Sequence, residues 1–506
     1  MKNKAVIAAL SLGSPAKGES LQRWLYSALR QAILDGRLPA KAVLPGSRSL
    51  AAEYRIARGT VQAAYAQLLS EGFLEAYAGS GTRISASLPD LAVNNETIAA
   101  RAELETDQPR LRTNSWIQFL QNAEPAFPIA TNKVLPVFSP HRADVSEFPM
   151  DVWRKLYARH LRPSKPDLVI DSDPAGLPEL RKAIAQYLGI ARGVSVSADN
   201  IVVLSSVQQA LDICLRLLVN RDEQVWMEDP GYMGARQLMQ AADIRVVDVN
   251  VDCDGMQIET AIKAAPDARL AYITPARQSP LGVSLSPERR LALLQWAKNN
   301  NAYIFEDDYD SEYRFVAKPI PTLKSLPGAN EYVVLAGTFS KLLFSGIRLA
   351  FVVPPPHLLN LFIRAASLTS RHANALTQAV LADFILEGNL DRHIRRMRRI
   401  YTRRAQTLQN AAQKYWSGLI NLSPIEAGLD VVGYLIGIDE QLAVQHLSAA
   451  GIGALPLSKY KGNNSLAPGL VIGFAAFNEE AIEQSAEKMG IILRELQKNP
   501  VEIYAY

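Results

Sequence analysis

The feature that most constrains the fold is an alternation of short apolar runs with helical patterns between residues 201 and 353. Apolar β-rich runs separated by helical segments are typical of βαβ units, in which helices cover both faces of a largely parallel sheet. The pattern therefore predicts an α/β domain. The runs are residues 201–204, 224–227, 270–274, 302–305, 332–336 and 348–353.

The first 84 residues have a different pattern. Apolar residues at helical spacing predict one helix from Ser20, a plausible N-cap, to the turn at Asp35-Gly36. A second helix, capped by Ser47, is expected over residues 48–54, and a third over residues 57–70. Residues 73–84 then predict a hairpin whose tip is Gly79-Ser80-Gly81. Three helices followed by a hairpin are typical of a winged helix-turn-helix.

Charge is distributed unevenly along the chain. Residues 1–84 contain 11 Lys+Arg and 5 Asp+Glu, a net charge of +6, so the remainder is at −2 within a total of +4. A basic module attached to a nearly neutral one fits attraction to phosphates, although a solvated basic surface gives the same count.

A chain of 506 residues is too long for a single core. We expect a DNA-binding domain over residues 1–84, a polar linker over 85–133 with one helix near 116–120, and an α/β domain over 134–506 that ends in a smaller lobe. The chain lacks the roughly 18 consecutive apolar residues that a membrane span needs. Its two cysteines, Cys214 and Cys253, are expected to be ordinary buried thiols in the cytoplasm.

The third helix of the N-terminal domain is the predicted recognition helix. Its leading side chains, Arg58, Thr60 and Gln62, can reach base edges or phosphates in the major groove. Arg48, at the start of the second helix, is placed for the DNA backbone. Gly79 and Gly81 at the hairpin tip complete the expected DNA-binding set.

The strings L-P-G-S-R-S-L-A, A-R-G-T-V-Q-A-A-Y-A-Q-L-L-S-E-G-F-L and G-S-G-T closely resemble the GntR-type winged helix. This resemblance covers residues 20–84 almost continuously. One departure is Gly59, which stands where GntR-type modules often have a side chain that contacts DNA. A winged helix that docks onto protein rather than DNA is the alternative.

Four motifs in the α/β region fit an aldehyde cofactor. Lys341 follows a predicted strand and can form an imine, and Asp307 and Tyr309 follow another strand, where they can serve a pyridine nitrogen and a ring oxygen. Tyr232, on the D-P-G-Y turn, can stack on a ring. The groups expected at a phosphate are the backbone N–H groups of Val207 and Gln208 and the side chains of Thr338, Ser340 and Arg348.

These motifs, together with Y-I-T-P-A-R-Q-S-P-L-G, E-D-D-Y-D-S-E-Y-R and G-T-F-S-K, look like the fold type I aminotransferase domain of MocR-type (GabR-like) regulators. The resemblance extends from about residue 134 to the last predicted helix. It implies pyridoxal 5'-phosphate as cofactor and Lys341 as the catalytic lysine that bonds to it. It also implies a homodimer, because fold type I sites form at a dimer interface.

The departures from this family weaken the prediction of turnover. No arginine precedes Gly473-Phe474, the region where aminotransferases generally bind a substrate carboxylate. Arg236 and Arg277 are the candidates to bind the carboxylate in its place. For each of them, a surface or packing role is an equal alternative. The other departures are Ser206 for a frequent Gly, Arg277 for His, Ser345 for Pro and Asp430 for the His of A-G-L-H.

The sequence favours a dimeric transcription regulator that binds double-stranded DNA and senses pyridoxal phosphate, an amino acid or an amine. A working aminotransferase is the main alternative, and a cofactor-buffering scaffold is the third. No metal site and no membrane contact are expected. The Arg-rich run over residues 391–404 is expected to be a solvated helix face, with contact to a partner subunit or flanking DNA as the alternative.

Overall fold

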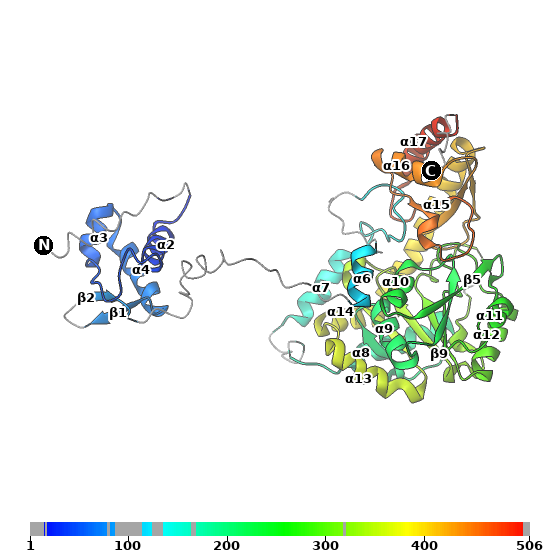
Figure 1. The fold of residues 1–506 in the computed structure, drawn as a ribbon, viewed down its shortest axis with the longest axis horizontal. Coiled ribbons are helices and arrows are strands. Elements are labelled where there is room, and N and C mark those ends of the chain that lie inside the picture. Colours follow the sequence, from blue (N-terminus) through cyan, green and yellow to red (C-terminus); the bar gives the residue numbers. More distant parts are fainter. Residues whose placement is uncertain are drawn as a thin grey trace. The chain divides into compact units, whose positions relative to one another are not determined.

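The structure is a computed structural model that describes residues 15, 18–77, 81–86, 114–123, 135–162, 168, 170–316 and 320–498. The chain divides into two compact units, Met1–Arg112 and Thr113–Tyr506. Figure 1 shows the first unit in blue and the second in cyan to red, and each is described by itself. Among the described residues, none of the helices combines the length and the apolar character required to cross a bilayer.

The first unit is a three-helix module with a hairpin, as its sequence predicts. Leu25, Leu29, Val61 and Leu68 are fully buried in its core, because their spacing places them on the inner faces of the first and third helices. Tyr65 donates from its hydroxyl to the carbonyl of Pro45 at 2.9 Å. The elements are α2 (Leu21–Leu34), α3 (Ser47–Tyr54), α4 (Arg58–Ser70), β1 (Leu74–Tyr77) and the antiparallel β2 (Gly81–Ile84).

One predicted cap in this unit is wrong. The N-cap of α3 is Gly46, and Ser47 is already the first helical residue. Its hydroxyl instead accepts a hydrogen bond from Nε of Arg58 at 3.4 Å, which joins the starts of α3 and α4. Ser20 does cap α2, accepting from the backbone N–H of Arg23.

The second unit is built on an eight-stranded mixed sheet in the order β3-β10-β9-β8-β7-β4-β5-β6. The five strands from β9 to β5 are parallel, whereas β3, β10 and β6 pair antiparallel with their neighbours. The predicted parallel sheet is therefore confirmed only for its middle. The strands are β3 (Val202–Leu204), β4 (Gln224–Asp229), β5 (Arg245–Asp252), β6 (Gly255–Met256), β7 (Leu270–Ile273), β8 (Tyr303–Asp308), β9 (Val333–Thr338) and β10 (Ala350–Val353).

Two of these strands were missed in the sequence. β5 has only one fully buried residue, Val249, so it lacks the continuous apolar run of the central strands. The turn between β5 and β6 contains Cys253, which is exposed. The prediction of two buried thiols is therefore wrong for Cys253 and confirmed for Cys214, which lies on the buried face of the helix that follows β3.

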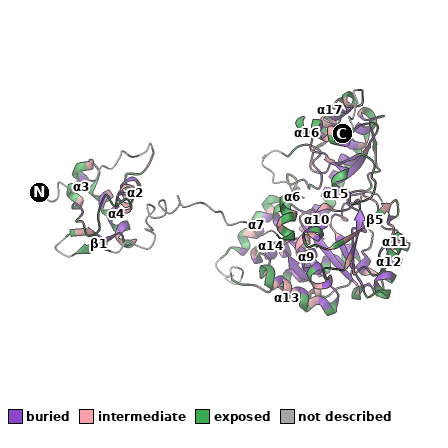
Figure 2. Ribbon diagram, viewed as in Figure 1, coloured by how far each residue is buried: buried purple, intermediate pink, exposed green. Residues whose placement is uncertain are grey.

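Helices cover both faces of the sheet, and Figure 2 shows the strands between them as largely buried. One apolar cluster packs α9, α10 and α13 against the sheet, and another packs α11 and α12. These helices are α9 (Val207–Leu218), α10 (Met233–Ala241), α11 (Ile258–Ala264), α12 (Pro287–Asn299) and α13 (Leu359–Ser370).

A third apolar cluster joins the remaining helices to a smaller lobe. That lobe contains an antiparallel sheet in the order β11-β12-β14-β13. Its elements and the neighbouring helices are α7 (Met150–His160), α8 (Pro178–Arg192), α14 (Ala375–Leu386), α15 (Asn389–Tyr415), β11 (Ile420–Leu422), β12 (Asp430–Leu435), α16 (Glu440–Ala449), β13 (Leu455–Pro456), β14 (Gly469–Gly473) and α17 (Glu479–Lys498).

The helix expected within the linker is present as α6 (Ser115–Asn122), and Asn114 caps it by accepting from the backbone N–H of Ile117. It belongs to the second unit, where it lies against α10 (Figure 1). None of its residues is fully buried, and Trp116 and Leu120 are exposed. The contact between α6 and α10 is therefore shallow.

The core of the first unit predicts a local effect of Leu25→Ala. This change deletes a fully buried side chain and should destabilise residues 21–84 by about 2–5 kcal/mol. Hydrogen exchange should accelerate there and stay unchanged in the second unit, because the two units have separate cores. Leu21→Ala, at a 43% exposed position of the same helix, is the control and should have little effect. Equal acceleration in both units would contradict the separation.

Candidate functional site

The central residue of the candidate cofactor site is Lys341, three residues after β9. Its ammonium donates to the backbone carbonyl of His141 at 2.7 Å. Burial lowers the pKa of Lys341 to about 8, although the charges of Asp430 and Asp310 oppose this change. The lowered pKa increases the share of uncharged amine near neutral pH, which is the form that attacks an aldehyde.

Asp307 lies near the end of β8, beside β9, with its Cα opposite that of Ala336. Its Oδ2 accepts a hydrogen bond from the hydroxyl of Tyr272 at 2.8 Å. Its Oδ1 is buried and has no hydrogen-bond partner among the described residues. Burial raises the pKa of Asp307 to about 7, and the bond from Tyr272 acts in the other direction. A buried carboxylate with one free oxygen fits a protonated ring nitrogen, which supplies both the missing donor and the missing charge.

The predicted phosphate-binding groups come from two strand ends. Val207 and Gln208 are the first residues of α9, whose N-cap is Ser206. An α-helix N-terminus carries free N–H groups and attracts anions. The amide of Gln208 donates to the carbonyl of Gly234 at 2.8 Å, which connects this terminus to the first turn of α10.

Thr338 is the last residue of β9, and Ser340 and Arg348 follow the strand. The backbone N–H of Ser340 donates to the hydroxyl of Thr338 at 3.1 Å. Arg348 is exposed and adopts a left-handed backbone conformation with φ of 49°. Burial and the charge of Asp307 raise the pKa of Tyr232, and the charge of Arg348 acts in the opposite direction.

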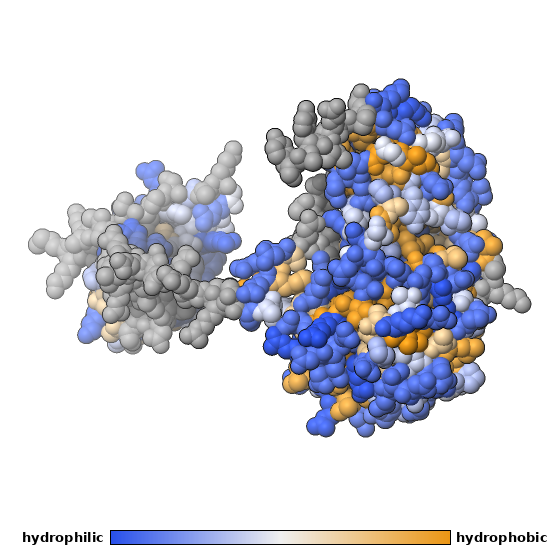
Figure 3. Space-filling view, turned by 45° about the vertical axis from the view of Figure 1, so that its right-hand side comes forward, coloured by the Kyte–Doolittle hydropathy of each residue, from blue (hydrophilic) through white to orange (hydrophobic). Residues whose placement is uncertain are grey.

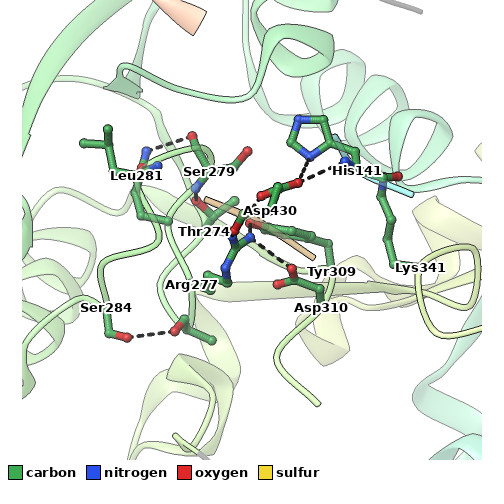
Figure 4. Close-up of polar contacts among 12 residues, drawn as sticks. His141, Thr274, Arg277, Ser279, Leu281, Ser284, Tyr309, Asp310, Lys341 and Asp430 are labelled. Atoms are coloured by element: carbon green, nitrogen blue, oxygen red, sulfur yellow. Dashed lines mark hydrogen bonds and ion pairs between the residues drawn. The ribbon is translucent and has the colours of Figure 1, made fainter. Parts of the chain in front are cut away.

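Tyr309 belongs to an ionic cluster that the sequence does not predict (Figure 4). Its hydroxyl accepts from Nη1 of Arg277 at 2.8 Å. The same guanidinium nitrogen pairs with Asp310 at 3.0 Å, and Nη2 pairs with the carboxylate of Asp430 at 2.8 Å. Nη2 also donates to the backbone carbonyl of Asp430 at 2.6 Å. Arg277 is only 3% exposed. Both of its terminal nitrogens bind partners inside the protein.

The cluster continues from Asp430 to His141. Nδ1 of His141 lies 2.7 Å from Oδ2 of Asp430, and its backbone N–H donates to the same oxygen at 3.0 Å. Nε2 of His141 lies 2.6 Å from the hydroxyl of Tyr460. Burial raises the pKa of Asp430, but the charges of His141 and Arg277 lower it below its usual value. Because the carbonyl of His141 binds Lys341, the cluster sets the position of the lysine.

The two arginines considered for a substrate carboxylate are therefore both engaged. Nη1 of Arg236 pairs with Asp248 at 2.6 Å, and Nη2 donates to the carbonyl of Glu228 at 3.4 Å. Arg277 and Asp430, noted separately as departures from the family pattern, are partners of one another. The two departures from the family pattern are therefore accounted for together, since Arg277 and Asp430 form one buried ion pair.

Sequence reasoning missed Tyr272, His141 and Tyr460. Tyr272 had a usable signal, because it lies near the end of β7, next to β8, where the polar ends of parallel strands meet. His141 and Tyr460 had none, since His141 lies in an irregular segment and Tyr460 ends a short 3-10 helix (Leu457–Tyr460), both far in sequence from Lys341.

The expected DNA-binding residues lie in the first unit. Arg58 is the first residue of α4, and it is exposed, as are Arg48 and Gln62, whereas Thr60 is partly buried. A Cβ on Gly59 would meet no atom within 4 Å, so core packing does not require this glycine. Gly81 is exposed at the start of β2 with φ of 84°, and Gly79 lies outside the described residues.

The Arg-rich run belongs to α15 and is only partly a solvated face. His393 and Arg404 are buried, and Arg404 pairs with Asp144 at 2.8 Å. Arg398 donates to the carbonyl of Glu312 at 2.7 Å. The remaining arginines of the run are exposed, and Arg396 pairs with Glu147. The expectation of a merely solvated face is therefore wrong for the inward residues.

Comparison with known families matches both units. Residues 21–84 match the bacterial regulatory proteins of the gntR family, and residues 144–431 match aminotransferase class I and II. The chain is 34% identical over 470 residues to MocR of Rhizobium meliloti, named as a probable rhizopine catabolism regulatory protein, covering 93% of both chains. It is 29% identical to PdxR of Corynebacterium glutamicum, an HTH-type pyridoxine biosynthesis transcriptional regulator, covering 93% of this chain and 95% of PdxR.

Solved structures resemble the second unit. The α-aminoadipate aminotransferase LysN of Thermus thermophilus, complexed with N-(5'-phosphopyridoxyl)-L-leucine, is similar with a TM-score of 0.67 and 23% identity. The similarity covers 78% of this chain and 99% of LysN. Pyrococcus horikoshii kynurenine aminotransferase gives a TM-score of 0.67 at 21% identity, covering 79% of this chain and 99% of that one. These likenesses show the fold.

The ionic cluster predicts a large effect of Gly428→Ala. A Cβ there would collide with the guanidinium of Arg277, which is held by Asp310 and Asp430 and cannot move without losing an ion pair. The free energy of unfolding of the second unit should fall by about 3 kcal/mol or more. Gly418→Ala is the matched control, because φ is also positive but a Cβ meets no atom within 4 Å. It should cost about 1–2 kcal/mol. Equal losses in chemical denaturation would contradict the collision.

Proposed function

Because the chain belongs to the MocR-type branch of GntR transcription regulators, we propose that its aminotransferase-like domain binds pyridoxal 5'-phosphate and senses an amine ligand. The protein is a DNA-binding regulator with an aminotransferase-like domain. The proposal adds that the cofactor site controls how the winged helix binds its operator in the cytoplasm.

The observation that carries this proposal is the presence in one site of a buried carboxylate and a partly buried amine. The Oδ1 atom of Asp307 lacks a hydrogen-bond partner among the described residues, and Lys341 is a partly buried amine whose pKa is lowered to about 8. An orphaned buried carboxylate costs free energy that a cationic partner would recover. These two groups match the ring nitrogen and the aldehyde of one cofactor.

When bound, pyridoxal phosphate supplies an aldehyde that bonds to primary amines and an electron-withdrawing ring. Asp307 would keep the ring nitrogen protonated, and Tyr232 would stack on the ring. Tyr309, which already accepts from Arg277, would serve the ring oxygen. The N-terminus of α9 at Val207 and Gln208, with the side chains of Thr338, Ser340 and Arg348, would hold the phosphate.

The site favours a sensor over a turnover enzyme. An aminotransferase must bind its substrate carboxylate and move a proton at the adjacent carbon, for which Lys341 would be the base. Arg277 and Arg236, the arginines expected to assist, are both held in internal ion pairs. A sensor needs only a ligand amine that would take the place of the Lys341 amine at the aldehyde carbon of the cofactor. We therefore expect ligand exchange with very slow turnover.

We propose that the effect of the cofactor passes through α10 within the second unit. Its N-cap is Tyr232, and Gln208 of α9 donates to Gly234 in its first turn. The helix α6, which lies in the segment that leads to the winged helix, lies against α10. The free energy of cofactor binding can shift this shallow contact, since a ligand changes the balance of two conformations by its difference in affinity for them.

We also propose that the protein acts as a homodimer. Figure 3 shows apolar areas, in orange, on one face of the second unit. The large exposed apolar side chains of that unit include Ile190 and Leu368, each 88% exposed. Exposed apolar surface favours burial against a second copy, and closed two-fold symmetry is the commonest arrangement of such copies.

Asp307→Asn tests the sensor. Because the amide cannot balance a pyridinium charge, cofactor retention should fall about tenfold or more, as expected when a charged partner is lost. Operator affinity of the wild type should depend on pyridoxal phosphate, and the variant should lose this dependence while keeping its basal DNA binding. Fluorescence anisotropy with labelled operator, with and without pyridoxal phosphate, measures the operator affinity of the wild type and of the variant.

Asp171→Asn, at an exposed carboxylate, is the control and should behave as the wild type. Brisk transamination over many turnovers, combined with operator binding that ignores the cofactor, would favour the enzyme instead.

Arg58→Ala tests the recognition helix. Loss of a base contact from the exposed start of α4 should weaken operator binding by about 1–3 kcal/mol without changing cofactor content. Arg23→Ala removes an equal charge from the exposed surface of α2 and should weaken binding less. Operator binding that stays at full strength in Arg58→Ala over a salt series would show that α4 does not read the DNA.

A further inference from the structure

One arginine beside the cofactor site has no assigned role. Arg142 immediately follows His141, whose carbonyl accepts the ammonium of Lys341 at 2.7 Å. Arg142 is exposed, and no ion pair or hydrogen bond of its side chain is found within the described part of the chain. It therefore differs from Arg277 and Arg236, whose guanidiniums are buried and paired.

The backbone at Arg142 is held by the preceding residue. His141 adopts a left-handed backbone conformation with φ of 61°, which residues other than glycine rarely adopt. Two bonds to Asp430 and one to Tyr460 hold it there. The residue that binds the Lys341 ammonium through its carbonyl therefore also fixes the start of the backbone at Arg142, the next residue in the chain.

The charge of Arg142 acts on the site directly. Burial is the main reason that the pKa of Lys341 is lowered, and the nearby positive charge of Arg142 lowers it further. An uncompensated guanidinium within electrostatic reach of a reactive amine favours an anionic group between them. Guanidinium binds carboxylates with two parallel hydrogen bonds, which an ammonium cannot do.

We propose that Arg142 binds the carboxylate of an amino acid whose amino group occupies the place of the Lys341 amine, so that the ligand sensed is an amino acid and not a simple amine. This inference rests on the proposed exchange of an amine at Lys341. It replaces Arg277 and Arg236 as carboxylate anchors with a residue from the segment before α7.

The test compares amines that differ only in the carboxylate. Holoprotein is titrated with L-alanine against ethylamine, and with L-phenylalanine against 2-phenylethylamine, while the visible absorbance of the cofactor is followed. The wild type should bind the amino acid of each pair about tenfold or more tightly, the contribution of one charge-assisted contact. Arg142→Gln should abolish this ratio and leave the affinity for the simple amines within about twofold. Arg142→Lys should restore part of it.

Arg154→Gln, at an exposed arginine of α7, is the matched control and should keep the wild-type ratio. A ratio near one in the wild type, or a wild-type ratio in Arg142→Gln, would overturn the assignment of Arg142 alone. Loss of cofactor from Arg142→Gln would also overturn it, because the arginine would then bind the phosphate. Absence of any spectral change with all four amines would overturn the proposed sensing of amines as well.

Discussion

The architecture of the candidate site depends on one buried arginine. Arg277 pairs with Asp310 after β8 and with Asp430 at the start of β12, and it donates to Tyr309. Removing one partner of a buried ion pair is costly, so the contacts of the two terminal nitrogens join the large sheet to the small lobe at this point, although Nε of Arg277 has no hydrogen-bond partner among the described residues. Gly428 leaves the space that the guanidinium occupies. The position of Lys341 follows, because Asp430 holds His141 and His141 holds the lysine.

This arrangement separates binding of the cofactor from turnover. The groups suited to the ring and the phosphate lie at the ends of strands and at a helix N-terminus, where an aminotransferase fold provides them without specialised partners. The arginines that the sequence suggested for a substrate carboxylate are instead structural. What remains near Lys341 is Arg142, an exposed cation in an irregular segment. Under the proposed function, a site built in this way would recognise an amine without the arginines that the sequence suggested for a substrate carboxylate.

The same elements give the site a connection to the rest of the chain. Gln208 joins the start of α9 to the start of α10, and α10 is the helix against which α6 lies. α6 has no buried residue, so little free energy opposes a change in its position. α6 therefore contacts the helix whose N-cap is Tyr232.

The sequence by itself determined the winged helix, the strand ends at Asp307 and Lys341, and the helix start at Val207, because periodicity, caps and strand boundaries are properties of neighbouring residues. It did not determine β5, whose side chains are only partly buried, or the cap of α3. Only the tertiary structure decided the roles of Arg277 and His141. Arg277 meets Asp310 across 33 residues and Asp430 across 153, and the carbonyl that binds Lys341 lies 200 residues before it. No local pattern encodes such partners, since they meet only when the sheet and the small lobe have packed together.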